Sequence, residues 1–329
     1  MILTIVLVVV GLLILLKGAD LLVSGASSLA LKLKIAPIVI GLTVVAFGTS
    51  APELVASVTG AMKGTTGLAF GNVVGSNIAN ILVILGITAM IAPLKVTSNT
   101  VWKEIPMSLL GACVLTVLGL QTLLDAGTLS TISLTGLNQV GEISLSNGII
   151  LLSFFVIFLY YTFGIAKVSG GEDEDITQLS GIRSGLYILL GVLGLGIGST
   201  LMVDNAVTLA QMFNVSDTLI GLTIIALGTS LPELTTSIKA ARKNQSEIAV
   251  GNVVGSNIFN IFLILGVTSL IRPIPIVGNN VFDIAVLFAS TMFLFITVFL
   301  FRKHRIDKWE GLFMVICYLV YLSIIIVRG

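Results

Sequence analysis

One segment of this sequence occurs twice, and this repeat limits the possible folds more than any other feature. Residues 41–94 and 221–274 align without a gap at a constant offset of 180. Roughly 30 of the 54 aligned positions are identical, which is far beyond chance for an internal repeat. Each copy contains GTSxPEL and then GNVVGSNIxN, both set in apolar sequence. We therefore expect the two halves to contribute equivalent parts of one site.

The long apolar stretches predict a membrane protein. Of the 329 residues, 56% are hydrophobic and 10% are charged, whereas soluble domains carry about 25% charged residues. Many stretches approach or exceed the ~18 residues that a helix needs to cross the hydrocarbon core, and the alternation of a β-barrel is missing. We predict an all-α integral membrane protein with ten transmembrane helices. The predicted spans lie near residues 2–29, 37–61, 67–91, 104–123, 147–166, 183–211, 217–241, 247–271, 281–301 and 309–327.

The distribution of Lys and Arg predicts the orientation. With the N-terminus outside the cell, the internal loops hold 13 of the 17 basic residues, the external side holds 3, and Lys17 lies within the first span. The positive-inside rule then places both termini on the extracytoplasmic side of the cell membrane. Because each half has five spans, the second half must enter the membrane from the opposite side, which makes the halves an inverted repeat. We expect residues 1–166 and 183–329 to form the halves, joined by an acidic cytoplasmic linker at 167–182. Inverted repeats of this kind are typical of secondary transporters.

Two acidic residues are predicted to lie well inside the membrane. Glu53 and Glu233 occupy equivalent positions in the second and seventh spans. A charged side chain at the bilayer centre costs on the order of 2.5–3.5 kcal/mol on insertion scales, so such residues usually have a function. The preceding prolines, Pro52 and Pro232, remove a helix hydrogen bond and release a backbone carbonyl. A bound cation would neutralise the glutamates; the alternative is a protonated Glu held by hydrogen bonds.

Neutral oxygen ligands surround these glutamates in the sequence. The first motif supplies the hydroxyl groups of Thr49, Ser50, Thr229 and Ser230. The second supplies side chains four residues apart on one helix face, namely Asn72, Ser76 and Asn80, then Asn252, Ser256 and Asn260. The alternatives are hydroxyls bonded to their own helix, and amides and glycines that only pack helices together. Carboxylates, amides, hydroxyls and carbonyls without sulfur or imidazole suit Na⁺ and Ca²⁺.

With both motifs present twice, the sequence resembles the calcium/cation antiporter superfamily, and most closely a prokaryotic sodium/calcium exchanger. The resemblance covers nearly the whole chain and implies ten helices, exchange of Na⁺ for Ca²⁺, and alternating access. It also implies a central calcium site at Glu53 and Glu233, which share in the sodium sites. The remaining ligands that it implies are Ala46 and Ala226 through their carbonyls, Thr49, Ser50, Ser76, Thr229, Ser230 and Ser256, with Asn80 and Asn260 at the remaining central positions.

The details of the motifs bear on the coupling ion. Some members of the superfamily have Asp where this chain has Asn260, so this site carries two formal negative charges rather than three. The potassium-dependent branch has Asp in place of one motif glutamate, and both glutamates are present here. The proton/calcium branch has GNxxEL-like sequence in place of GTSxPEL, which favours sodium as the driving ion. An H⁺/Ca²⁺ exchanger, or another proton-coupled divalent-cation exchanger, remains the alternative.

The rest of the sequence suggests few other activities. The single histidine, His304, leaves little material for a zinc site or for hydrolase chemistry at Ser50 or Ser230, so we expect no enzyme and no cofactor. We expect Ca²⁺ and Na⁺ as substrates and the lipid bilayer as surroundings, with no nucleic acid and no obligatory protein partner. A channel would use similar oxygens, but the inverted repeat favours alternating access. Three minor expectations concern a solvated linker rather than a calcium site at the acidic run 172–175, buried thiols at Cys113 and Cys317, and Lys17, Asp20 and Asp204 as interfacial or paired groups.

Overall fold

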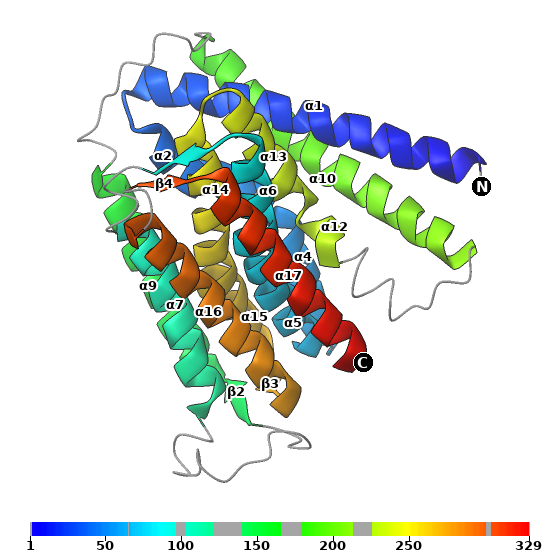
Figure 1. Cartoon of the computed structure of the whole chain (residues 1–329), viewed down its shortest axis with the longest axis vertical. Coiled ribbons are helices and arrows are strands. Elements are labelled where there is room, and N and C mark those ends of the chain that lie inside the picture. Colours follow the sequence, from blue (N-terminus) through cyan, green and yellow to red (C-terminus); the bar gives the residue numbers. More distant parts are fainter. Residues whose placement is uncertain are drawn as a thin grey trace.

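Long apolar helices build the protein, as the computed structural model shows for residues 2–64, 66–96, 103–121, 140–165, 179–212, 226–300 and 304–328 (Figure 1). In the first half the helices are α1 (Ile2–Leu33), α2 (Pro37–Ile40), η1 (Gly41–Val45), α3 (Ala46–Thr49), α4 (Ala51–Met62), α5 (Thr66–Ala79), η2 (Asn80–Leu85), α6 (Gly86–Ile91), α7 (Ile105–Gly119) and α9 (Leu145–Ile165). In the second they are α10 (Gly181–Met212), α12 (Ala226–Thr229), α13 (Leu231–Arg242), α14 (Ser246–Ile258), η5 (Phe259–Ile264), α15 (Leu265–Ile271), α16 (Gly278–Leu300) and α17 (Lys308–Arg328). The η segments are π-helical turns, in which the helix widens locally.

The prediction of an all-α membrane protein is confirmed. Within the described residues, seven helices are long and apolar enough to cross a bilayer, and the bent helix from Pro37 to Met62 makes an eighth. Two predicted spans do not reach this length. The helix α7 has 15 residues, and the predicted seventh span begins within 213–225, which lie outside the described residues.

Two short β-ribbons connect the halves, which the sequence did not predict. Strand β1 (Leu94–Lys95) pairs with β4 (Arg305–Ile306), and β2 (Gly141–Ile143) pairs with β3 (Ile274–Ile276), both antiparallel. The strand β2 lies between the predicted spans 104–123 and 147–166, and three residues are too few to give an alternating pattern. The two ribbons lie at opposite ends of the bundle (Figure 1).

The helices α1 and α10 form a closely packed pair that runs across the other helices (Figure 1). Glycines allow the two backbones to approach: a Cβ atom added to Gly18 would lie 2.7 Å from the amide nitrogen of Leu195. At Gly191 it would lie 2.6 Å from the amide nitrogen of Leu22. Small residues at such contacts are typical of membrane helices.

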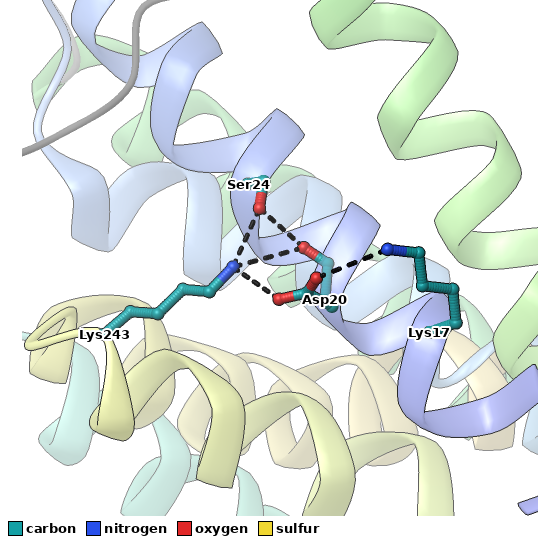
Figure 2. Close-up of polar contacts among 4 residues, drawn as sticks. All are labelled: Lys17, Asp20, Ser24 and Lys243. Atoms are coloured by element: carbon teal, nitrogen blue, oxygen red, sulfur yellow. Dashed lines mark hydrogen bonds and ion pairs between the residues drawn. The ribbon is translucent and has the colours of Figure 1, made fainter. Parts of the chain in front are cut away.

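An ion pair joins this helix pair to the rest of the bundle (Figure 2). Lys243, at the end of α13, places its Nζ 2.6 Å from Oδ1 of Asp20 and donates to Oγ of Ser24 at 2.8 Å. Lys17 lies 3.8 Å from the other carboxylate oxygen of Asp20. The expectation that Lys17 and Asp20 are paired is therefore confirmed.

Candidate cation-binding site

The predicted glutamates lie where two helices restart after a break. Ser50 has φ −85° and ψ 5°, and Ser230 has φ −87° and ψ 4°, so both repeats leave helical geometry at the same point. The first break bends the helix by 47°. Glu53 and Glu233 follow in the first turns of α4 and α13. Free backbone N–H groups at a helix N-terminus favour negative charge, so each break places a carboxylate where the helix stabilises it.

The two glutamates are buried together at the centre of the bundle. Each residue is 1% exposed. Ser50 Oγ donates a hydrogen bond of 2.9 Å to Glu233 Oε1, which reaches from one repeat to the other. Ser256 Oγ lies 3.5 Å from the same oxygen. The structure thus brings together side chains that are up to 206 positions apart in the sequence (256 − 50).

The predicted amide ligands lie on widened helical turns that pack against the glutamate-bearing helices of the opposite repeat. Asn80 begins η2, which packs against α13, the helix that carries Glu233. Asn260 lies in η5, which packs against α4, the helix that carries Glu53. Both asparagines are 1% exposed. Each of these asparagine-bearing turns therefore packs against the helix that carries the glutamate of the other repeat.

Many oxygens of these residues have no hydrogen-bond partner among the described residues, although they are fully buried. They are Glu53 Oε1 and Oε2, Glu233 Oε2, Ser76 Oγ, Ser230 Oγ, Asn80 Oδ1 and Asn260 Oδ1. Roughly 90% of buried polar groups in proteins are hydrogen-bonded, so such a concentration is unusual. All of these atoms can accept, and hard oxygens of this kind suit Na⁺ and Ca²⁺.

Some of the predicted ligands are already engaged by the protein. The single hydroxyl hydrogen of Thr49 has two acceptors within reach, Asn252 Oδ1 at 3.0 Å and the Ala46 carbonyl at 3.3 Å from Oγ1. The Ala46 carbonyl also accepts from the backbone N–H of Ser50 at 2.9 Å. The helix α12 begins at Ala226 and ends at Thr229. The carbonyl of Gly228, four residues before Pro232, accepts a hydrogen bond of 2.9 Å from Ser199 of α10.

Two residues of the site escaped the sequence analysis. Asn77 and Asn257 are buried and accept hydrogen bonds from the predicted ligands Asn260 and Asn80. Their signal was present, because both copies read GSN, but spacing alone placed them off the face that carries Ser76 and Asn80. The sequence of one repeat does not show which of its side chains form hydrogen bonds with the other repeat.

The remaining predicted groups lie away from this site. No group of three or more His, Cys, Asp or Glu side chains occurs within the part of the chain that the structure describes. Cys113 and Cys317 are free thiols, and the prediction that they are buried is wrong, since both are half-buried. Cys317 lies on α17, and only 22% of the apolar window of this helix is buried. The acidic run 172–175 lies outside the described residues.

A helical membrane protein with buried carboxylates and unpartnered neutral oxygens at its centre has the features of a cation transporter. The comparisons agree, since residues 3–164 and 183–327 match the sodium/calcium exchanger protein family. The chain belongs to this family of transporters. It is 32% identical to the sodium/calcium exchanger MaX1 of Methanosarcina acetivorans, over 96% of both chains. It is 37% identical to the putative antiporter CaxA of Alkalimonas amylolytica, over 95% of this chain and 96% of that protein. The solved structure of the sodium/calcium exchanger from Methanococcus jannaschii superimposes with a TM-score of 0.82 at 31% identity, covering 98% of both chains.

Proposed function

We propose that this protein is a secondary antiporter that exchanges Na⁺ for Ca²⁺ across the cell membrane. The observation that carries the proposal is the set of unpartnered oxygens around Glu53 and Glu233. Calcium takes 6–8 oxygen ligands, and two carboxylates neutralise one Ca²⁺. Transported Ca²⁺ and Na⁺ are the substrates.

The proposed binding site contains twelve residues in or next to the two motifs. They are Glu53, Glu233, Thr49, Thr229, Ser50, Ser230, Ala46, Ala226, Ser76, Ser256, Asn80 and Asn260. The glutamates hold the cation by charge, and the hydroxyl and amide groups complete its shell. The alanines contribute backbone carbonyls, and the Ala46 carbonyl accepts a hydrogen bond from Thr49 and another from the Ser50 amide in this structure.

We further propose ten transmembrane helices in two inverted halves, with both termini extracytoplasmic. Reciprocal contacts support a two-fold relation: Asn80 bonds Asn257, and Asn260 bonds Asn77, at positions offset by 180 (257 − 77). The β-ribbons, each joining one half to the other, lie at opposite ends of the bundle, as expected when the axis lies in the membrane plane (Figure 1).

Alternating access would then involve the α1–α10 pair and the site-bearing helices. The pair packs along its own glycine contacts and touches the other helices mainly through α13, with further contacts to α2, η1, α12 and α3. Movement of the pair across the centre would open the site to each side in turn. An empty site carries two buried negative charges and should cross poorly, whereas a loaded, neutralised site should cross readily.

A proton-coupled calcium exchanger is the second candidate, because the same glutamates can carry protons instead of Na⁺. Two features favour Na⁺. The motif reads GTSxPEL in both copies, and the relative MaX1, similar along nearly the whole chain, is named a sodium/calcium exchanger.

The glutamate assignment is tested with Glu53→Gln and Glu233→Gln in proteoliposomes. We expect both variants to insert and fold but to lose calcium uptake. The matched control is Asp204→Asn, which removes a carboxylate from an exposed position within α10 and should leave uptake unchanged. Uptake at the wild-type level by both Gln variants would refute the assignment.

A further inference from the structure

Four buried asparagines join the two repeats in one hydrogen-bonded cluster. Asn77 and Asn80 come from α5 and η2, and Asn257 and Asn260 come from α14 and η5. Each side chain is at most 1% exposed. We call these four residues the amide cluster.

The cluster is reciprocal. Asn80 Nδ2 donates to Asn257 Oδ1 at 3.0 Å, and Asn260 Nδ2 donates to Asn77 Oδ1 at 2.9 Å. In addition, Asn77 Nδ2 lies 3.4 Å from the Asn257 backbone carbonyl, and Asn257 Nδ2 lies 3.4 Å from the Asn77 backbone carbonyl. Every side-chain N–H group named here points toward the opposite repeat.

The backbone carbonyls determine which way all four amides are turned. A backbone carbonyl can only accept, so the groups of Asn77 and Asn257 that face these carbonyls must be their NH₂ groups. Their Oδ1 atoms then face Asn260 and Asn80, which must donate to them through their own NH₂ groups. A turned amide anywhere in the cluster would place two acceptors or two donors against each other.

This arrangement leaves the Oδ1 atoms of Asn80 and Asn260 buried and without a hydrogen-bond partner among the described residues. We propose that Asn77 and Asn257 are positioning residues, which turn the ligand amides so that each presents its oxygen, and not its N–H groups, to the transported cation. The proposal rests on the proposed function. Each ligand is oriented by the other repeat: Asn77 acts on Asn260, and Asn257 acts on Asn80.

Because Asn77 pairs with Asn260 and Asn257 pairs with Asn80, a positioning role can be distinguished from a general effect on protein stability. Asn77→Ala removes the acceptor for Asn260 but keeps the Asn77 carbonyl that orients Asn257, so only the Asn260 amide is released to turn. Loss of a group that orients a metal ligand typically lowers metal affinity about 10- to 100-fold. A carboxylate has no N–H group to misdirect, and Asn77→Ala also removes the Oδ1 acceptor that would face it, so in Asn260→Asp the Asn77→Ala change should cause no loss of calcium affinity.

The experiment measures the calcium concentration for half-maximal uptake in proteoliposomes, and calcium binding by calorimetry in detergent. Asn77→Ala and Asn257→Ala are each made in the wild type, in Asn260→Asp and in Asn80→Asp. Asn147→Ala is the control, because this amide on α9 donates to the Glu142 carbonyl at 3.1 Å and lies outside both motifs and the cluster. Thermal unfolding establishes that each variant is folded. If Asn77→Ala does not fold, the Asn257→Ala series tests the same proposal, and the reverse also holds.

We expect Asn77→Ala to weaken calcium about 10- to 100-fold in the wild type and in Asn80→Asp. In Asn260→Asp its effect should be less than about twofold, the limit for independent changes. Asn257→Ala should show the opposite dependence. Equal losses in all backgrounds, or a loss as large with Asn147→Ala, would overturn the positioning role while leaving the proposed function intact. A wild type that neither binds nor transports calcium would overturn both.

Discussion

A methyl group added at Gly198 tests how closely α1 and α10 pack. The new Cβ atom would lie 2.5 Å from the amide nitrogen of Leu15 and 2.8 Å from the Gly11 carbonyl oxygen. Ordinary contact begins at 3.4 Å, so the helices would have to separate by about 0.9 Å (3.4 − 2.5) at this point. Overpacking against backbone atoms typically costs about 1–3 kcal/mol, and the higher helix propensity of Ala offsets at most about 1 kcal/mol. We expect Gly198→Ala to lower the free energy of unfolding by about 1–2 kcal/mol.

Gly196→Ala is the matched control on the same helix, because no described atom lies within 4 Å of its added Cβ. It gains the same propensity without the clash and should leave stability unchanged or slightly higher. Both variants are compared by equilibrium unfolding in mixed detergent micelles, beside calcium uptake. Equal stability of the two variants would refute the close packing of α1 and α10.

Two further predictions concern polar contacts outside the amide cluster. Asp20→Asn breaks the ion pair with Lys243. Because both side chains are more than a third exposed, a double-mutant cycle should give a coupling free energy of only about 0.2–1 kcal/mol, reduced by salt. A coupling above about 2 kcal/mol would contradict this. Asn252→Ala removes buried bonds to Thr49, Ser237 and the Glu233 carbonyl. It should lower the free energy of unfolding by about 2–4 kcal/mol, and an unchanged unfolding midpoint would count against those bonds.

The sequence was sufficient to predict the class of protein and the burial of the two repeated glutamates. Apolar length predicted the helices because a bilayer leaves few alternatives for a backbone without water. The repeat then identified Glu53 and Glu233, since a buried charge repeated at the same motif position requires an explanation beyond packing. Both glutamates lie buried at equivalent helix breaks.

Contacts between the repeats could not be predicted in the same way. The roles of Asn77 and Asn257 depend on which helix faces which, and helical spacing within one repeat says nothing of that. The bond from Ser199 to the carbonyl released by Pro232 likewise needs the position of α10. The β-ribbons are too short to leave a periodic pattern.

The central claim is that this site exchanges Na⁺ for Ca²⁺. The most direct test is uptake of calcium-45 into proteoliposomes loaded with Na⁺, beside vesicles loaded with K⁺ and vesicles given a pH jump. We predict rapid uptake only when Na⁺ can leave the vesicle, and none with K⁺ or with the pH gradient alone. Uptake that follows the pH gradient and ignores Na⁺ would contradict the claim and make the protein a proton-coupled calcium exchanger.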